Sequence, residues 1–246
     1  MKFKEIKKSI KTIILCGGFG TRLAEETKII PKPMVKIGKK PILEHIINFY
    51  NMYGFDNFIL SCGYKAKIIK DYFEIAKNKK NLKIISINTG LDSLTGGRVL
   101  KLKKFFRKDE IFMVTYGDGL SNINLDKLLK FHLFHNKIAT MTIVRPPARF
   151  GIVKFNNKKI IKKFEEKPQV SEGWVNGGFF IFNYKIFNYI KKNNEMLEKY
   201  TFKKLVELNQ LVAYEHDGYW QCMDTLRDKI FLNKIWKTGE APWIKK

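Results

Sequence analysis

A glycine-rich loop that directly follows a short apolar run is the feature that most constrains this chain. Residues 12–16 (TIILC) are typical of a buried strand. The loop Gly17-Gly18-Phe19-Gly20-Thr21-Arg22-Leu23 comes next. In this position a loop lies at the carboxyl edge of a sheet, where glycines let backbone amides approach a phosphate closely.

Three interpretations of the loop are open: an ordinary tight turn, a dinucleotide-binding loop and a triphosphate-binding loop. The dinucleotide pattern requires a third glycine where this chain has Leu23. A Walker loop requires Gly-Lys-Ser/Thr, which is absent from the sequence. By itself the loop therefore predicts only a place where phosphates can bind.

Two cations accompany the loop. Arg22 lies within it, and Lys32 stands between Pro31 and Pro33. The two prolines restrict the backbone and help to aim the lysine side chain. A lysine between prolines is commonly a surface residue, but its closeness to a phosphate-type loop favours a role for Lys32 in phosphate binding.

The spacing of apolar residues predicts an α/β fold. Further buried strands are expected at 58–62, 82–87, 111–115 and 138–144, and amphipathic helices at 41–50, 65–76 and 125–135. This alternation predicts a mostly parallel, Rossmann-like sheet with helices on both faces. Beyond about residue 146 the expected strands lie closer together, at 151–155, 160–164, 177–182 and 211–216, with helices near 198–208 and 225–236.

The length and the absence of a linker indicate a single domain over residues 1–246. Residues 1–10 form a basic extension and residues 11–145 a core built around the glycine loop. We expect residues 146–246 to extend the same sheet and to add a small β/α region that covers its ligand crevice.

The formal net charge is +24, from 47 basic and 23 acidic residues. The lysines are spread along the whole chain, and aromatic residues are not interleaved with them as a stacking platform, so we expect no nucleic-acid partner. A positive field would still attract small phosphorylated molecules.

No apolar run approaches the roughly 20 residues that a membrane span needs, and the basic N-terminus lacks the features of a signal peptide. We therefore expect a cytoplasmic protein without a membrane partner. The three cysteines, Cys16, Cys62 and Cys222, have neither paired nor metal-type spacing, so we expect small buried side chains. The histidines form no ligand constellation.

The chain resembles the sugar-1-phosphate nucleotidyltransferases, and among them the glucose-1-phosphate cytidylyltransferases. The resemblance begins with the glycine loop and Pro-Lys-Pro-Met at 31–34 and runs from about residue 11 to the C-terminus. The remaining motifs follow in family order: CGYK at 62–65, TGGR at 95–98, YGDG at 116–119, PPARFG at 146–151, FEEKP at 164–168, VNGGFF at 175–180 and GYWQCMDTLRDK at 218–229.

The resemblance implies a glycosyltransferase-A-like fold and a reaction in which a sugar-phosphate oxygen attacks the α-phosphorus of a nucleoside triphosphate. The implied substrates are CTP and glucose 1-phosphate, and the products CDP-glucose and pyrophosphate, in the supply of surface polysaccharides. Since the nucleophile is already anionic, catalysis would rest on positioning and electrostatics. We also expect a homo-oligomer.

The resemblance also assigns residues. It makes Arg22, Lys32 and Asp118 catalytic, and Asp118 and Asp224 the ligands of Mg²⁺, a cation that usually takes one or two protein carboxylates. The alternative for Asp224 is a helix cap before Thr225. The implied nucleotide contacts are Leu15, Cys16, Gly17, Gly18, Phe19, Gly20, Thr21, Arg22, Lys32, Ser93, Arg98 and Gly117, and the sugar-phosphate contacts are Glu166, Lys167, Asn176 and Gly177.

Two departures from the family pattern affect these expectations. The stretch 74–88 is shorter than in the resembling enzymes, which leaves assembly and base choice open. The stretch 197–202 (LEKYTF) replaces a family segment with a Glu-Pro pair, which would alter the wall of the sugar site. Rival hypotheses are another nucleotide or acceptor, a non-catalytic nucleotide-sugar binding module and, from charge alone, a nucleic-acid binder.

Overall fold

The computed structural model describes residues 3–76, 82–146, 151–165 and 173–244. Its centre is a seven-stranded sheet of β12 (Leu211–His216), β8 (Ala139–Val144), β11 (Val175–Asn183), β6 (Ile111–Tyr116), β1 (Lys11–Cys16), β4 (Asn57–Cys62) and β5 (Lys83–Asn88), in that order. Strand β11 runs antiparallel to β6 and β8, and every other neighbouring pair is parallel. The predicted mostly parallel sheet is confirmed.

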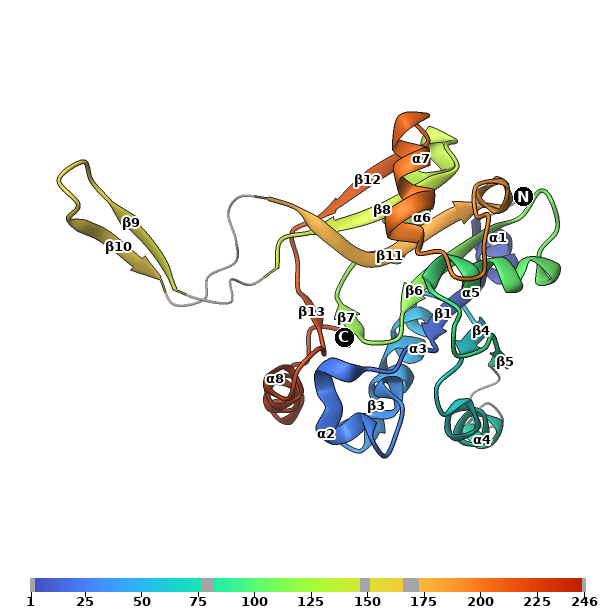
Figure 1. Ribbon diagram of the computed structural model, residues 1–246, viewed down its shortest axis with the longest axis horizontal. Coiled ribbons are helices and arrows are strands. Elements are labelled where there is room, and N and C mark those ends of the chain that lie inside the picture. The colour runs from blue at the N-terminus through green and yellow to red at the C-terminus, as the bar shows by residue number, and fades with distance from the viewer. Residues whose placement is uncertain (1–2, 77–81, 147–150, 166–172, 245–246) are drawn as a thin grey trace.

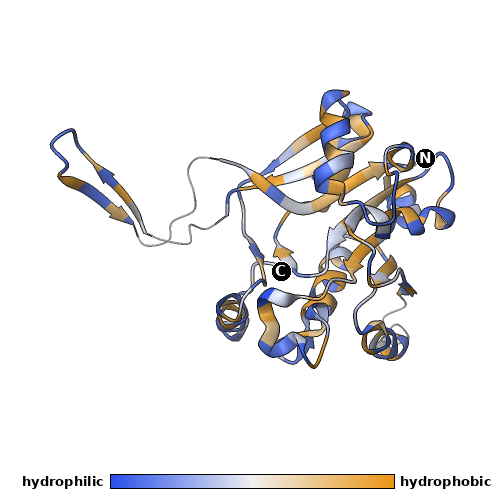
Figure 2. Cartoon of the chain, viewed as in Figure 1, coloured by the Kyte–Doolittle hydropathy of each residue, from blue (hydrophilic) through white to orange (hydrophobic). Residues whose placement is uncertain are grey.

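Alternation along the strands divides the interior into two cores. On β1, Ile14 and Cys16 belong to one hydrophobic cluster, whereas Ile13 and Leu15 belong to the other. Because successive strand side chains point to opposite faces, the two clusters lie on opposite sides of the sheet. Figure 2 shows the apolar residues concentrated in the strands of the body.

Helices cover both faces, as predicted. Buried residues of α3 (Ile42–Met52), α4 (Ala66–Ala76), α6 (Leu125–His135) and α8 (Leu226–Lys237) join the first core. The second core receives residues of α5 (Thr95–Lys101), α7 (Phe202–Glu207) and the short 3-10 helix η5 (Tyr184–Asn188). Before α7 the chain forms one turn of π-helix, η6 (Leu197–Thr201), within the single helix expected at 198–208.

The second region behaves partly as expected. Its strands β11 and β12 extend the same sheet on either side of β8, which confirms that expectation. The hairpin of β9 (Ile152–Phe155) and β10 (Ile161–Glu165) instead projects away from the body (Figure 1). The ribbon of β7 (Gly119–Ser121) and β13 (Trp220–Cys222) brings the C-terminal part of the chain back to the sheet.

Small elements complete the structure. The basic N-terminal extension forms helix α1 (Phe3–Ser9), and Lys7 pairs with Asp126 at 2.7 Å. The remaining elements are η1 (Thr21–Leu23), α2 (Ala24–Thr27), η2 (Lys32–Met34), β2 (Lys36–Ile37), β3 (Lys40–Pro41) and η4 (Lys103–Phe105). Among the described residues, no helix has the length and apolar character to cross a bilayer.

Candidate functional site

The glycine loop leaves the carboxyl end of β1, which lies between β4 and β6. The guanidinium of buried Arg98 fixes its first residue: Nη2 donates to the Gly17 carbonyl at 2.8 Å. The same guanidinium donates through Nη1 to the carbonyls of Cys62 (3.1 Å) and Gly90 (3.0 Å). A Cβ on Gly17 would lie 1.9 Å from Arg98 Nη1, so a side chain here would have to displace the guanidinium from these carbonyls.

A second glycine brings the loop close to Lys32. Gly20 has φ +68°, a left-handed conformation that disfavours a side chain. A Cβ at Gly20 would also lie 2.8 Å from Thr27 Cγ2 and 2.9 Å from Lys32 Cβ. The Thr27 hydroxyl closes the turn by donating to the Gly20 carbonyl at 3.1 Å. The loop and Lys32 are therefore packed as one unit.

The two aspartates are far apart in the sequence, Asp118 in the middle of the chain and Asp224 near its C-terminus, and they meet through the β7–β13 ribbon. Asp118 immediately precedes β7, and its carbonyl accepts a hydrogen bond from the Met223 N–H at 2.9 Å. Asp224 is the next residue. On the other side, Gly117 N–H donates to the Leu15 carbonyl at 3.1 Å, which attaches this segment to β1. Antiparallel pairing thus places both carboxylates beside the glycine loop.

Lys32 is the centre of the cluster. Its Nζ lies 2.6 Å from Asp118 Oδ2 and 2.5 Å from Asp224 Oδ1. Arg22 donates to the second oxygen of Asp224, and 70% of the Arg22 side chain is exposed. Burial by itself lowers the pKa of Lys32, but the two carboxylates outweigh it, so the pKa is raised above 10.5 and the ammonium form is favoured.

The cap interpretation of Asp224 is wrong. Thr225 is the N-cap of α8: its side chain accepts from Asp228 N–H, and Asp228 in return accepts from Thr225 N–H at 2.8 Å. Asp228 also accepts from the Asp224 N–H at 3.0 Å. This capping box leaves the Asp224 carboxylate to Lys32 and Arg22.

The cluster has the donor chemistry of a divalent-cation site. Two carboxylates converge on one positive charge, the Lys32 ammonium, so the position already favours a cation. Within the described ranges, no group of three or more His, Cys, Asp and Glu side chains could hold a metal. A hard cation there would take Asp118 and Asp224 and complete its coordination with water and ligand oxygens, as Mg²⁺ does.

The described sugar-site residues lie on β11, next to the strand that leads to Asp118. Asn176 Nδ2 donates to the Tyr116 hydroxyl at 3.1 Å. The Gly177 carbonyl accepts from Trp220 Nε1 at 2.7 Å, which ties β11 to the ribbon that carries Asp224. The other two predicted sugar contacts, Glu166 and Lys167, lie outside the described residues.

Ser93 is buried and lines a cavity of about 210 Å³ that Gly90, Leu91, Asp92, Lys101, Asn193 and Asn194 complete. Its hydroxyl donates to the Thr89 carbonyl at 2.6 Å and accepts from Lys101 Nζ at 2.8 Å.

A larger cavity, of about 380 Å³, includes Ile138 and Gln210, which precede β8 and β12. It therefore lies at the amino ends of those strands, away from the cluster.

The structure also shows the surroundings of Phe19, a predicted nucleotide contact, and of the three cysteines. Half of the Phe19 side chain is exposed, and its ring lies 5.3 Å from that of Tyr64. Cys16 and Cys62 are buried opposite one another on β1 and β4, as expected, while Cys222 is partly exposed. Burial raises the pKa of the Cys62 thiol to about 12, so it remains a neutral packing group.

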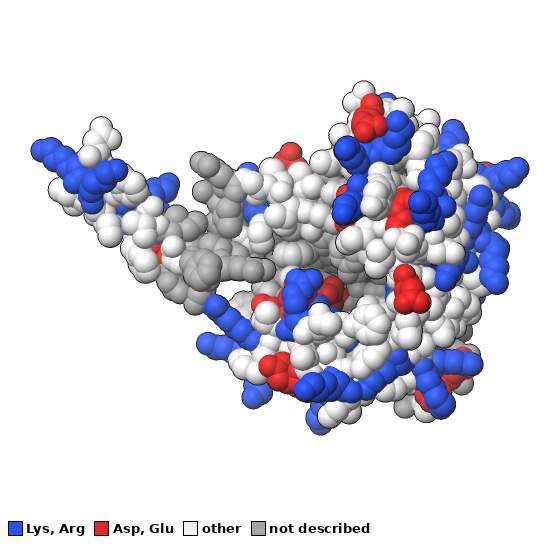
Figure 3. Space-filling model, viewed as in Figure 1, with Lys and Arg blue, Asp and Glu red and all other residues white. Residues whose placement is uncertain are grey.

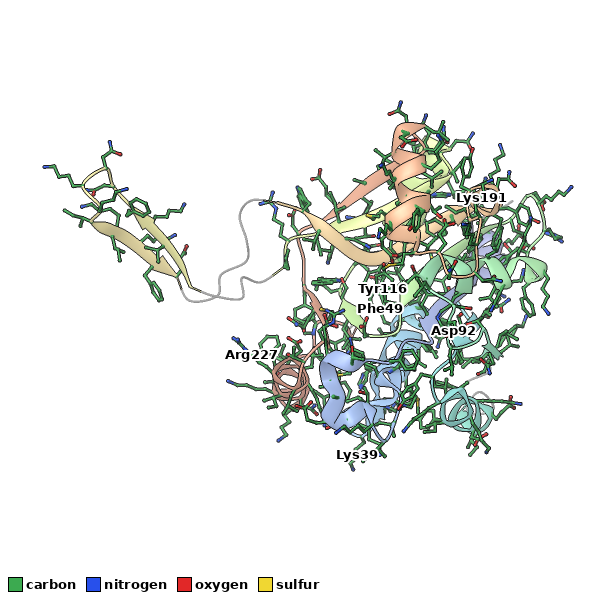
Figure 4. The ribbon with its side chains drawn as sticks, viewed as in Figure 1. Lys39, Phe49, Asp92, Tyr116, Lys191 and Arg227 are labelled. Atoms are coloured by element: carbon green, nitrogen blue, oxygen red, sulfur yellow. The ribbon has the colours of Figure 1, made fainter. Side chains whose placement is uncertain are left out.

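Sequence reasoning missed a polar group beside Asn176. Tyr116 ends β6 in the middle of the molecule (Figure 4), and its hydroxyl donates to Glu198. Thr95 donates to the other oxygen of Glu198 at 2.6 Å. Tyr116 and Thr95 belong to the YGDG and TGGR motifs, and Glu198 belongs to the divergent stretch 197–202 on η6, but no local pattern connects these three residues.

Comparisons with known proteins identify the family of the chain. The Nucleotidyl transferase family model matches residues 11–229. The chain is 39% identical to glucose-1-phosphate cytidylyltransferase of Salmonella typhimurium, over 95% of this chain and 98% of the relative. It is equally identical to the probable glucose-1-phosphate cytidylyltransferase of Bacillus subtilis, over 95% and 99%.

Solved structures share the fold. HddC from Yersinia pseudotuberculosis superposes with a TM-score of 0.71 at 26% identity, over 92% of this chain and 99% of that one. A putative glucose-1-phosphate thymidylyltransferase from Bacillus anthracis gives 0.75 at 19% identity, over 97% of both chains, which shows a common fold alone.

Proposed function

The chain belongs to the nucleotidyl transferase family, and on this premise we propose that it transfers a cytidylyl group from CTP to glucose 1-phosphate. The products are CDP-glucose and pyrophosphate. The substrates follow from relatives named for this activity that match nearly the whole chain. The observation that carries the reaction class is Lys32, held between Asp118 and Asp224 beside the glycine loop.

The reaction sets an electrostatic task. A phosphate oxygen of the sugar attacks the α-phosphorus of the nucleotide, the new P–O bond forms in line, and pyrophosphate leaves. The nucleophile is anionic near neutral pH and needs no strong base. The difficulty is to bring two anions together and to neutralise the charge that collects on the leaving group.

The residues of the cluster meet this task. The loop amides, Arg22 and Lys32 bind the triphosphate, and both cations neutralise charge on the departing pyrophosphate. Asp118 and Asp224 would hold Mg²⁺, which supplies further positive charge to phosphate oxygens when bound. With the carboxylates engaged by that ion, Lys32 and Arg22 would be available to the phosphates. Glu166 and Lys167 remain predicted contacts of the sugar phosphate.

A substitution at Asp118 tests the assignment. Asp118→Asn keeps the size of the side chain but removes the charge that would hold the cation. We expect turnover to fall by about 10³-fold or more, with the melting temperature nearly unchanged. Release of pyrophosphate from CTP and glucose 1-phosphate measures the effect.

The matched control is Asp71→Asn, the same change on the exposed face of α4, where Asp71 pairs with Lys67 among the described residues. It should retain full activity. Wild-type turnover in the Asp118→Asn protein would overturn the metal assignment. That result would not support the hypothesis of a non-catalytic binding module, because this hypothesis predicts that the wild-type protein itself has no turnover.

The nucleotide and the acceptor are tested separately. Each of the four nucleoside triphosphates is incubated with glucose 1-phosphate, and each of several sugar 1-phosphates with CTP. We expect preference for CTP, and mass spectrometry should identify CDP-glucose. Preference for another triphosphate would refute the cytidylyl assignment while leaving the reaction class intact.

We infer a cytoplasmic location from the need for CTP, and a role in supplying sugars for polysaccharides from the expected product. The homo-oligomer stays a prediction that sedimentation velocity can test. No nucleic-acid partner is proposed, because Figure 3 shows lysines and arginines scattered over the visible face and the β9–β10 hairpin.

A further inference from the structure

Glu198 joins three segments that are far apart in the sequence. It lies on the π-turn η6, 82 residues from Tyr116 and 103 from Thr95. One carboxylate oxygen accepts the Tyr116 hydroxyl proton, and the other accepts from Thr95 Oγ1 at 2.6 Å. Both oxygens of this partly buried carboxylate are therefore committed to neighbouring hydroxyl groups.

The Tyr116 hydroxyl transmits this arrangement to Asn176. The hydroxyl has one proton, which it donates to Glu198. The Tyr116 oxygen is therefore left as an acceptor, and it accepts a hydrogen bond from Asn176 Nδ2 at 3.1 Å. The Asn176 Oδ1 accepts from Gly178 N–H at 2.8 Å. These two bonds fix which way the amide points. They leave the second Nδ2 proton without a partner among the residues that the structure describes.

Packing on β11 holds the Tyr116 ring in this position. Its ring lies 5.7 Å from that of Phe180 in a T-shaped contact. A Cβ at Gly178, which has φ +78°, would lie 2.4 Å from Tyr116 Cδ2, so the ring packs closely against the β11 backbone. Burial, and then the charge of Glu198, raises the pKa of the Tyr116 hydroxyl, so it stays protonated and donates.

The Glu198 side of the network is anchored by α5. Leu197 N–H donates to Thr95 Oγ1 at 3.0 Å, so the Thr95 proton is directed to Glu198. The next residue, Gly96, donates its N–H to the Glu195 carbonyl at 2.9 Å. A Cβ on Gly97 would lie 1.7 Å from the Asn193 carbonyl oxygen, so the glycines allow this close approach.

We propose that Glu198 is a positioning residue of the sugar subsite, an inference that rests on the proposed function. Glu198 orients the Tyr116 hydroxyl as an acceptor, and the hydroxyl orients the Asn176 amide. Asn176 then presents its remaining N–H to one ring hydroxyl of the sugar 1-phosphate. The network would thereby help to select the sugar without touching the reacting phosphates.

Kinetics of Glu198→Ala and Tyr116→Phe test the proposal. We expect the KM for glucose 1-phosphate to rise about tenfold in each, as for the loss of one oriented hydrogen bond. The KM for CTP and kcat should stay within about twofold of wild type, because this network does not contact the triphosphate cluster. Tyr116→Phe keeps the ring packing and serves if Glu198→Ala does not fold.

Glu195→Gln is the matched control. Glu195 belongs to the same segment, is buried, and accepts from the Thr201 hydroxyl at 2.7 Å and Lys191 N–H at 3.0 Å. It has no bond to Tyr116 or Asn176 among those that the structure shows. This variant should lower the melting temperature without changing the KM for either substrate.

Deoxy analogues of glucose 1-phosphate, each lacking one ring hydroxyl, give the decisive readout. Wild type should discriminate against one analogue, and Tyr116→Phe should lose most of that discrimination. Unchanged discrimination, or an equal rise in the KM for CTP, would overturn the proposal. A wild-type enzyme inactive with glucose 1-phosphate would instead refute the assigned substrate. The wild type and the variants would then be compared with deoxy analogues of the sugar 1-phosphate that the enzyme does use.

Discussion

At the scale of single residues, Lys32 has two partners in the free protein and would acquire others with substrate. It now neutralises Asp118 and Asp224, and 12% of its side chain is exposed. In the proposed complex the carboxylates would hold a divalent cation and Lys32 would turn to the phosphates. Lys32 therefore acts as an internal counter-ion that keeps two like charges together before substrate arrives.

Replacing this lysine should expose the repulsion between the two carboxylates. We expect Lys32→Met to lower the free energy of unfolding by about 2 kcal/mol without metal, since breaking a partly buried ion pair leaves charge uncompensated. Millimolar Mg²⁺ should restore much of the loss. Turnover should fall by about 10²-fold or more even with metal, because a phosphate-binding cation is gone.

Urea unfolding with and without Mg²⁺ measures this effect, and Lys39→Met, on an exposed turn, is the control. An equal gain from Mg²⁺ in wild type and Lys32→Met would contradict the counter-ion role. Because the pKa of Lys32 is raised, its stabilisation is fully present below pH 10.5 and is lost only as the pH rises through the raised value. Measurements near neutral pH therefore capture all of it.

At the scale of elements, the short helix α5 serves both ends of the proposed site. Its first residue, Thr95, binds Glu198 beside the sugar strand, and Arg98, one turn later, holds the Gly17 carbonyl. Residues three apart lie close together on a helix. The motif TGGR thus connects the glycine loop and the Glu198 segment of the proposed sugar subsite to the same short helix.

Helix α6 provides a pH-sensitive element far from the cluster. His135 Nδ1 accepts from Lys137 N–H at 2.9 Å, so its Nε2 carries the proton and donates to Thr140 Oγ1 at 2.7 Å. The Thr140 hydroxyl then donates to His132 Nδ1 at 2.8 Å. Burial, and then His135, lowers the pKa of His132 to about 3, so His132 is neutral in the folded protein.

We expect this histidine to make the fold acid-sensitive. A folded pKa of about 3 lies below the ordinary 6.5, so the unfolded chain takes up the proton first as the pH falls. The stabilisation is complete above pH 6.5, and about 2 kcal/mol should be lost between pH 6.5 and pH 5. Urea unfolding of wild type and His132→Gln across this range isolates the effect, and parallel pH curves would contradict it.

At the scale of the whole molecule, a net charge of +24 faces two anionic substrates. A field of this sign speeds the encounter with CTP but does not alter the chemical step. We expect kcat/KM for CTP to fall several-fold as salt rises from low to physiological ionic strength, with kcat little changed. Stopped-flow binding of CTP would check the same dependence, and a parallel fall in kcat would refute it.

The sequence by itself determined the features that are local in the chain. Apolar periodicity predicted most strands and helices within one or two residues, because burial on a sheet or a helix face imposes a period of two or 3.6. The predicted parallel sheet also placed the loop after β1 and the carboxylate after β6 at one edge, because the carboxyl ends of parallel strands lie together. Lys32 was found because it follows the loop closely.

Only the tertiary structure decided which distant residues meet. It gave the Asp224 carboxylate to Lys32, 192 residues away, and the helix cap to Thr225. It showed that Arg98, predicted as a nucleotide contact, holds the carbonyl of Gly17, and it brought Glu198 to Tyr116. Such contacts arise from strand order and from the β7–β13 pairing, which depend on how the whole chain packs and leave no periodic signal near the residues themselves.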